Sequence, residues 1–422
     1  MIKHDIVVVG GGFTGAAAAI AAAREGADVL LVEKGNSLGG ASVNALVNPF
    51  MPNATKIDGV VTELSQGLFM EIENELNRYA DKYHPNRKYT NNRTFHEEYL
   101  KIILNRMAQE SGVHLLFHCM LIGANTQDGK ITSIQVASPS GVHEIEGNIF
   151  IDTTGDMNLG AFAGCEYIMG RAKDNLCQPM TLCFRLGNVD LEKYVAVRET
   201  ITPLYQKFKE EGKIKNKYEC VLIFHTVMDG VLHFNSTRAV KYNPVDPEDL
   251  TKAELEVREY VFELYDFLRE NIDGFQNACL LSTGMEIGIR ESRKLVGDFV
   301  LTQEDLVACT KFEDSIALGN YDIDIHNPEG SGTSHYYFPE GQYYSIPYRT
   351  LLPKEINNLL VAGRCISETH EAQASTRILP IVCCLGEAAG LAAHLAVKDS
   401  VAPKDVDIDA LHSLLKKNGA MF

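Results

Sequence analysis

The sequence predicts an α/β fold in which a nucleotide-binding domain is assembled from both ends of the chain, with a second, α+β domain inserted between them. Three observations predict it. A strand, a glycine-rich turn, a helix and a second strand follow one another over residues 5–33. This alternation is absent from about 164 to 348, where the runs are mixed, polar and aromatic. A strand and a small-residue helix return from residue 358 onward.

Composition and charge narrow the class of protein. The chain has 422 residues, 45% hydrophobic and 23% charged, as in a globular protein with room for two domains. A formal net charge of −17 argues against partners such as nucleic acid or an anionic membrane, although a few arginines can still build a positive pocket. We expect no targeting segment, and the apolar run 16–23 is too short to span a bilayer. We therefore expect a cytoplasmic protein.

Turn and capping signals divide the N-terminal half. We expect strands at 5–9 and 28–33 around a helix at 14–25, and an amphipathic helix near 65–79. Thr94 and Glu97 form a capping box that predicts the start of another helix. The strands expected after that helix are 113–119, 121–125, 131–138, 142–146 and 149–152, with an antiparallel meander in the middle.

The C-terminal half has fewer signals. Thr251 and Glu254 form a capping box at the start of a long helix, 251–272. A strand is expected at 358–362, and Pro380 stands at the first position of a helix that runs to 397. These elements predict a Rossmann-like domain made of 1–45, 93–164 and 349–422, and a substrate or cap domain made of 46–92 and 165–348.

The ten cysteines do not form a metal-binding pattern. They are scattered in apolar contexts, apart from the adjacent Cys383 and Cys384, and no C-x-x-C occurs. We therefore expect buried, reduced thiols and no metal site.

A G-x-G-x-x-G motif, formed by Gly10, Gly12 and Gly15, joins the first strand to the first helix. Its glycines permit a tight turn, close approach of the backbone to a pyrophosphate, and close packing of helix on strand. The free N–H groups at the start of the helix favour phosphate. Glu33 ends the second strand 18 residues after Gly15, near the distance expected for an acid that binds ribose. The unit predicts a dinucleotide site.

A second glycine pair, Gly39-Gly40, favours FAD over NAD, because NAD domains usually lack a pair at this place. No second G-x-G-x-x-G follows a strand, and Gly284 and Gly288 have the wrong spacing. We therefore expect FAD without a built-in nicotinamide domain, so that the electron donor or acceptor is a separate, unknown partner.

Further motifs lie along the chain: T-G-D at 154–156, G-I-R-E-S-R-K-L-V-G-D at 288–298, I-P-Y-R at 346–349, L-V-A-G-R-C-I-S-E-T-H at 360–370, S-T-R at 375–377 and G-E-A-A-G at 386–390. Together with the glycine motifs they resemble the FAD-dependent oxidoreductases of the glutathione-reductase-type fold. The narrower resemblance is to the heterodisulfide reductase A-like flavoproteins, and a more distant one is to the succinate dehydrogenase and fumarate reductase flavoproteins. The resemblance covers 5–397 and is weakest between 165 and 280.

The resemblance implies which residues hold FAD. The pyrophosphate would lie against Gly10, Gly12, Phe13, Thr14 and Gly15, and the adenosine ribose against Glu33 and Lys34. The ribityl chain would pass Gly39, Gly40, Ala41 and Ser42, with the backbone of Met120 facing the adenine. Gly155 and Asp156 would close the adenosine side, and Gly363 and Arg364 would reach the phosphate and ribityl region. The flavin would lie along Arg377, Leu379 and Ile381, with the start of the last helix directed at its C2 carbonyl.

The chain departs from these families in two respects. It lacks the cysteine-rich iron–sulfur segments of the heterodisulfide reductase A-type proteins. The stretch 41–46 has neither the histidine nor a cysteine to which some succinate dehydrogenase-type proteins attach FAD. We therefore expect non-covalent FAD.

Arg377, His370 and Arg290 are the candidate catalytic residues. Arginine clamps a carboxylate and histidine transfers protons near neutral pH. The alternative for Arg377 is a contact with FAD or backbone alone. The alternative for Arg290, with Arg293 and Glu291 beside it, is a structural ion-pair cluster between the domains.

Two more histidines are candidates for proton transfer. His326 and His335 lie at a Gly- and Ser-rich stretch, 327–341, which has the composition of a lid over a substrate. An exposed loop packed on the other domain is the alternative. The sequence does not choose between these two and His370.

We predict an oxidoreductase that passes a hydride equivalent between non-covalent FAD and a small substrate bearing a carboxylate or hydroxyl group. Two alternatives stay open: a flavoprotein subunit that relays electrons between proteins, and a protein that binds FAD without net turnover, as a structural cofactor, an isomerase or a sensor. An acidic surface does not forbid a homo-oligomer.

Overall fold

A seven-stranded sheet forms the centre of the structure, a computed structural model that describes residues 2–90 and 93–422. Its strands are β1 (Ile2–Val9), β2 (Val29–Val32), β5 (His114–Leu116), β6 (Met120–Gln127), β7 (Lys130–Ser138), β8 (Gly141–Asp152) and β19 (Leu359–Val361). The order is β5–β2–β1–β8–β7–β6, with β19 also on β8. The pairs around β1, β2 and β19 are parallel, which confirms the predicted α/β class.

Strand β8 belongs to both the parallel and the antiparallel part of this sheet. Its residues 145–152 pair in parallel with β1, and residues 141–146 pair antiparallel with β7. The prediction of two separate strands at 142–146 and 149–152 was therefore wrong. Gly147 stays extended beneath the side chain of Val7, so it does not end the strand.

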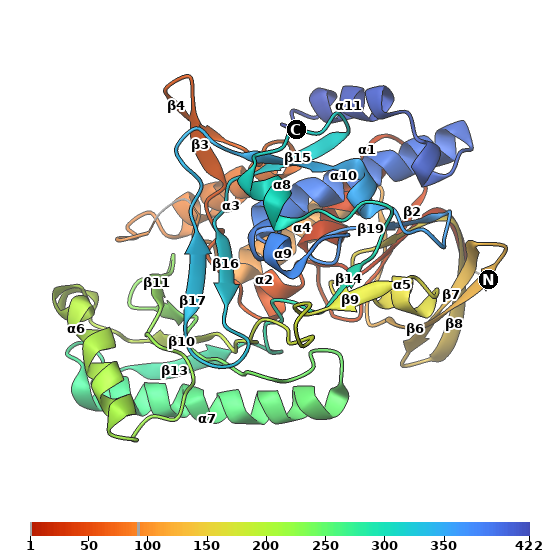
Figure 1. Cartoon of the computed structure of the whole chain (residues 1–422). Coiled ribbons are helices and arrows are strands. Elements are labelled where there is room, and N and C mark those ends of the chain that lie inside the picture. Colours follow the sequence, from red (N-terminus) through yellow and green to blue (C-terminus); the bar gives the residue numbers. More distant parts are fainter. Residues whose placement is uncertain (1, 91–92) are drawn as a thin grey trace.

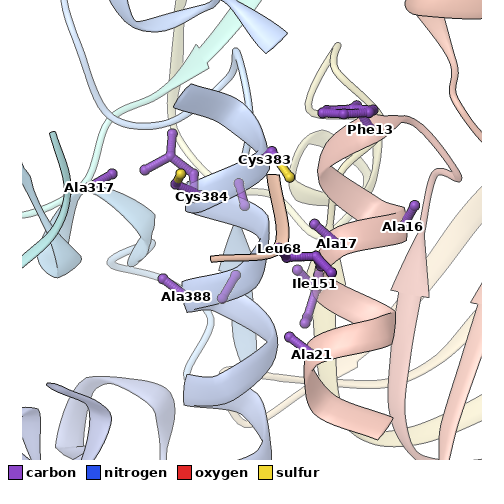
Figure 2. Packing of buried hydrophobic residues seen from close by; sticks show 14 of the residues in the cluster. Phe13, Ala16, Ala17, Ala21, Leu68, Ile151, Ala317, Cys383, Cys384 and Ala388 are labelled. Atoms are coloured by element: carbon purple, nitrogen blue, oxygen red, sulfur yellow. The ribbon is translucent and has the colours of Figure 1, made fainter. Parts of the chain in front are cut away.

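Two helices rich in small residues cover one face of the sheet, α1 (Phe13–Arg24) and α10 (Leu379–Asp399). They lie side by side in Figure 2, with Ala17 and Cys383 among the buried residues around their contact. Nearly all of α1 is buried, and its alanines let the second helix approach closely. Helices α3 (Leu68–Tyr83), α4 (Glu97–Glu110) and α11 (Ile408–Lys417) complete this layer.

A smaller apolar cluster lies on the other face, beneath the meander β6–β7–β8. The short helix α5 (Asn158–Phe162) contributes to it, and the pair β9 (Tyr167–Met169) and β14 (Arg293–Leu295) follows. Both ends of the chain therefore contribute to one α/β lobe.

A second lobe is built on an antiparallel sheet with its own core. The strands, in hydrogen-bonded order, are β11 (Ile223–His225), β12 (Leu232–Phe234), β10 (Phe184–Gly187) and β13 (Cys279–Thr283). Helices α6 (Leu191–Glu210) and α7 (Pro247–Asn271) pack on it, at the bottom of Figure 1. The buried residues of this core all fall between 180 and 287, within the segment predicted as the inserted domain. The domain boundaries themselves stay a prediction.

The remaining elements connect the two lobes. They are α2 (Ala41–Asn44), β3 (Ala54–Ile57), β4 (Val60–Glu63), α8 (Gln303–Val307), β15 (Ser315–Gly319), β16 (Ile323–His326), β17 (Thr333–Tyr336), β18 (Tyr344–Pro347), η1 (Tyr348–Leu351), α9 (His370–Thr376) and η2 (Pro403–Asp405). The pairs are β3–β4, β15–β18 and β16–β17. The hairpin β16–β17 runs between the lobes in Figure 1.

Both predicted capping boxes were wrong. Helix α4 begins at Glu97 with His96 as its cap, and the Glu97 carboxylate pairs with Arg185 instead of reaching back to Thr94. Helix α7 begins four residues before Thr251, because the Asp246 side chain accepts the first N–H groups and the proline that follows suits a first turn.

Among the described residues, α10 is the one helix long and apolar enough to cross a membrane. Within the fold, 89% of its most apolar window is buried, as expected for a core helix. Its second residue is Pro380, one position later than predicted.

Candidate active site

A cavity of about 440 Å³ is lined by residues of both lobes. The α/β lobe contributes the two glycine segments, the ends of β2 and β8, and the start of α10. The second lobe contributes the segment before β10, the start of α7 and the segment before β14. The cavity therefore runs from the predicted dinucleotide site to a polar end that holds Arg290 and Arg377.

The first glycine motif is shaped by close backbone contacts. Gly10 has φ +103°, and a Cβ there would lie 2.6 Å from the carbonyl oxygen of Thr153. A Cβ at Gly15 would overlap the carbonyl of Gly10. At Gly12, which lines the cavity, no described residue other than Gly12 and its two chain neighbours has an atom within 4 Å of such a Cβ. The open space beside Gly12 suits a group bound against the backbone.

The second glycine pair lies against the first. The Gly39 N–H donates to the Gly11 carbonyl at 2.8 Å, and a Cβ at Gly40 would lie 2.7 Å from Gly12 Cα. Gly40 has φ +51°, a conformation that glycine adopts at no steric cost. The two segments, 10–15 and 39–40, thus form two adjoining backbone surfaces, here named the glycine walls.

The predicted ribose acid lies at these walls. The buried carboxylate of Glu33 accepts the N–H of Gly11 at 2.5 Å and the N–H of Gly35 at 2.6 Å. Each oxygen keeps a lone pair for a ribose hydroxyl. Lys34 pairs with Glu286 of the second lobe at 2.9 Å, and both line the cavity.

Arg364 is held by protein groups. Its Nε donates to the Gly155 carbonyl at 2.7 Å, its Nη1 to the Ile289 carbonyl at 2.5 Å, and its Nη2 to Asp156. It therefore ties the end of β8 to the segment before β14.

Arg290 lies at the polar end of the cavity and has neutral partners. Its Nη1 donates to the Pro179 carbonyl at 2.8 Å and to Thr181 Oγ1 at 2.5 Å, and its Nη2 to Asn235 Oδ1 at 3.3 Å. Burial, with a further contribution from the charge of Arg377, lowers the pKa of Arg290 to about 10. The side chain is still a cation at neutral pH.

Arg377 lies beside Arg290 and has one acidic neighbour. Its Nη2 lies 3.7 Å from Asp324 Oδ2 and donates to the Asp324 carbonyl at 3.3 Å. Burial alone would raise the pKa of Asp324, but a hydrogen bond from His326 and the charges of the two arginines hold it well below its usual range. Asp324 is therefore a carboxylate, and it offsets one of the two arginines.

His326 lines the cavity, but both of its ring nitrogens have partners. Its Nδ1 accepts from Arg238 Nη2 at 3.0 Å, so its Nε2 carries the hydrogen that points to Asp324 Oδ2 at 3.3 Å. Burial and the neighbouring Arg290 lower its pKa to about 3. The ring is neutral at physiological pH and supplies no proton as an imidazolium.

A model of the family described as FAD dependent oxidoreductases matches residues 5–415. The chain belongs to this FAD-dependent oxidoreductase family. The glycine walls, Glu33 and the open space beside Gly12 fit an FAD dinucleotide, so the cofactor prediction is confirmed at the level of the family.

Three of the distant likenesses found among solved structures are of similar extent. A geranylgeranyl bacteriochlorophyll reductase-like protein from Thermoplasma acidophilum shares 14% identity, with 99% of this chain and 83% of that chain covered and a TM-score of 0.48. p-Nitrophenol 4-monooxygenase from Pseudomonas putida shares 11% identity, with 100% of this chain and 88% of that chain covered and a TM-score of 0.46. L-Proline dehydrogenase from P. horikoshii shares 12% identity, with 100% of both chains covered and a TM-score of 0.44. No curated protein matches the sequence significantly. Likenesses this distant carry no argument about the substrate.

Most of the residues predicted to hold FAD in this oxidoreductase line the cavity. They are Gly10, Gly12, Phe13, Thr14, Glu33, Lys34, Gly39, Gly40, Ala41, Gly155, Asp156, Gly363, Arg364, Arg377 and Leu379. Four others do not: Gly15 packs under Gly10, Ser42 donates to the Gly39 carbonyl, Ile381 is buried in the core, and Met120 is exposed on β6. The individual contacts with FAD stay predictions.

His370, the second catalytic candidate, does not line the cavity. Its Nδ1 pairs with Glu291 Oε2 at 2.7 Å, and Lys294 pairs with the other oxygen of that carboxylate. All three side chains are buried. Burial would raise the pKa of Glu291, but His370 and Lys294 hold it below its usual value. This geometry favours a supporting role for His370.

The predicted ion-pair cluster around Arg290 has a different composition. Arg293 donates to the Asp156 carbonyl and to Asn158 Oδ1, and Glu291 pairs with Lys294 and His370. Neither arginine pairs with Glu291. Since Arg290 alone of the two lines the cavity, its place as a candidate is the stronger.

The stretch predicted as a lid, 327–341, is hydrogen-bonded to the second lobe. Arg238 donates to the carbonyls of Gly330 at 3.1 Å and Gly332 at 2.9 Å. His335 pairs with Asp322 at 2.5 Å and does not line the cavity. Of the three histidines left open by the sequence, only His326 reaches the cavity.

A buried amide pair lies behind the arginines and was not predicted. Gln178 Nε2 donates to Gln373 Oε1 at 3.2 Å, and Gln373 Nε2 donates to the Arg290 carbonyl at 2.8 Å. Gln178 Oε1 accepts from Arg377 Nη2 at 3.5 Å, and the Gln178 N–H donates to Glu291 at 2.9 Å. No sequence motif marks either glutamine, because their partners are distant in the chain.

Proposed function

We propose that this FAD-dependent oxidoreductase transfers a hydride equivalent between non-covalent FAD and a small substrate that bears a carboxylate or hydroxyl group. The supporting observation is the single cavity that runs from the glycine walls to the end with Arg290 and Arg377. A cofactor on the glycine walls and a substrate beside the arginines would share that one space.

The residues that would hold the cofactor are those of the glycine walls, with Glu33 at the ribose. When bound, FAD supplies a two-electron acceptor or donor. At the other end, the start of α10 opens on the cavity through Ile378 and Leu379, and its free N–H groups favour negative charge there. Arg290 and Arg377 would orient the substrate.

Several properties of the complete system belong to this proposal. The FAD would be non-covalent because 41–46 contains no histidine or cysteine. The electron partner would be a separate molecule, because the sequence has one dinucleotide motif. We further propose kinship with the heterodisulfide reductase A-like proteins, without their iron–sulfur segments, a cytoplasmic location and no nucleic-acid or membrane partner. A homo-oligomer is compatible with the acidic surface.

Anaerobic titration of the yellow protein with a panel of metabolites tests this function. Loss of the flavin absorbance on addition of one class of compound would identify the substrate. If dithionite bleaches the flavin and no metabolite does, the protein binds FAD without substrate turnover or takes electrons from a protein. Acid precipitation is the companion test: flavin in the supernatant supports non-covalent binding, and flavin in the pellet contradicts it.

A further inference from the structure

We propose that Arg290 and Arg377 form an anion site that binds one carboxylate group of a monoanionic substrate. The proposal rests on the proposed function and narrows it, since it excludes a substrate whose only polar group is a hydroxyl. It also names the charge of the substrate.

The first argument is the unbalanced charge of Arg290. Its three acceptors are the Pro179 carbonyl, the Thr181 hydroxyl and the Asn235 amide oxygen, all of them neutral, and it makes no ion pair in the described part of the chain. Arg290 is half-buried and lines the cavity, and a cation in such a position is stabilised when an anion pairs with it. Guanidinium groups bind carboxylates through parallel N–H donors, which adds geometric selectivity. Residues 2–90 and 93–422 supply no such carboxylate within ion-pair distance of Arg290.

The second argument is a count of charges at this end of the cavity. Arg290 and Arg377 are cations, Asp324 is a carboxylate, and His326 is neutral. Asp324 approaches Arg377, at 3.7 Å, and leaves Arg290 without a partner. One positive charge is therefore unmatched among these four groups. One carboxylate balances it, whereas the second charge of a dicarboxylate would find no cation among these four groups.

The third argument is that both arginines are held in place before a ligand arrives. Gln373 fixes the backbone of Arg290, and Gln178 accepts from the side chain of Arg377. The two amides bond to each other, and Glu291 anchors Gln178 from behind. A preorganised pair loses little conformational entropy when an anion binds.

The cofactor's pyrophosphate is the other anion to consider. The glycine walls at Gly12 and Gly40 offer it backbone N–H groups and the start of α1. Arg290 instead bonds to Thr181 and Asn235 of the second lobe, and Arg377 stands two residues before α10 begins. The arginines therefore serve the substrate end of the cavity.

Calorimetric titration of the FAD-loaded protein tests the proposal with acetate, glycolate and benzoate, each against its neutral amide. We expect at least one carboxylate to bind at least about tenfold tighter than its amide, as for a charged hydrogen-bonded pair. Arg290→Gln and Arg377→Gln should each remove most of that preference. Arg293→Gln is the matched control, because the Arg293 side chain does not line the cavity and donates to the Asp156 carbonyl and Asn158 Oδ1, and it should keep the preference. Malonate should gain nothing over acetate from its second charge.

Three outcomes overturn the proposal: no carboxylate binds, each amide binds as tightly as its acid, or the preference survives in both cavity variants. A separate FAD titration of the apoproteins distinguishes the two sources of negative charge. Arg290→Gln should change FAD affinity less than about threefold, whereas a loss of about tenfold or more would assign Arg290 to the pyrophosphate. Thermal unfolding identifies any variant that fails to fold, and in that case Arg290→Lys replaces it and should weaken the preference. Failure of the wild type to bind FAD would contradict the proposed function itself.

Discussion

Gly12 and Gly15 belong to one motif, yet a methyl group would meet different surroundings at each. At Gly12 it would enter the cavity, and at Gly15 it would overlap the Gly10 carbonyl. We expect Gly12→Ala to lower FAD affinity at least about tenfold, because the added carbon occupies cofactor space. The melting temperature of the apoprotein should barely change, since Gly12 has a φ of −64° that alanine also adopts. Fluorescence titration with FAD and thermal unfolding measure the two effects.

Gly15→Ala is the control, and it should destabilise the apoprotein itself. If Gly12→Ala also destabilises the apoprotein, or leaves FAD affinity unchanged, the space beside Gly12 does not belong to the cofactor.

His370 provides a second prediction at this scale. A residue that transfers a proton in the reaction contributes about 10²- to 10⁴-fold to the rate. His370 does not line the cavity. We therefore expect His370→Gln to slow flavin reduction by the identified substrate less than about tenfold, and to leave the pH dependence of the reduction rate unchanged. Stopped-flow reduction across pH measures this. A larger loss together with a missing ionisation would restore His370 as a proton-transfer residue.

The close contact between α1 and α10 depends on two glycines of α10. A Cβ at Gly386 would overlap the Thr14 carbonyl, and one at Gly390 would overlap the Ala18 carbonyl. We expect Gly390→Ala to lower the free energy of unfolding by about 1–3 kcal/mol, the range for overpacking a core. Urea unfolding of the apoprotein measures it.

Gly160→Ala, in α5, is the matched control. The atoms nearest to its Cβ belong to the flexible side chain of Met157, so this helix should lose no more than about 0.5 kcal/mol. Equal losses in the two variants would mean that the close approach of α10 to α1 is not what constrains Gly390.

The stability of the whole molecule should depend on pH through Glu387, which joins α10 to the start of α3. Its buried carboxyl accepts the Leu68 N–H at 3.1 Å, and burial raises its pKa to about 7. A raised folded-state pKa adds stability that is full below the unfolded pKa of about 4.3 and is lost as the pH rises through 7. The size of this contribution is about 4 kcal/mol.

We therefore expect Glu387→Gln to resemble the wild type at pH 4.5 and to be more stable than the wild type at pH 8. Urea unfolding of both apoproteins at the two pH values measures the difference. Glu368, whose pKa burial raises to about 8, contributes in the same direction in both proteins and cancels. The same pH slope in the variant would show that Glu387 does not carry it.

The parts of the site that could be predicted from sequence are local. Gly10, Gly12, Gly15 and Glu33 lie within one strand–helix–strand unit, so their spacing along the chain fixes their spacing in space. The α/β class follows from the same unit. The capping box at Thr94 failed for a reason outside local sequence, because the Glu97 carboxylate pairs with Arg185, 88 residues away. The box at Thr251 failed because Asp246, a nearer cap, starts α7 earlier.

What the sequence by itself determined is the dinucleotide site, because backbone shape at glycines and a helix start depends on neighbouring residues. Only the tertiary structure decided the polar end of the cavity. Arg290, Asp324 and Arg377 meet there from distant segments, and the Gln178–Gln373 bond joins residues 195 apart. Whether an arginine is matched by an acid depends on which side chains packing brings within a few ångströms, and no local pattern records that.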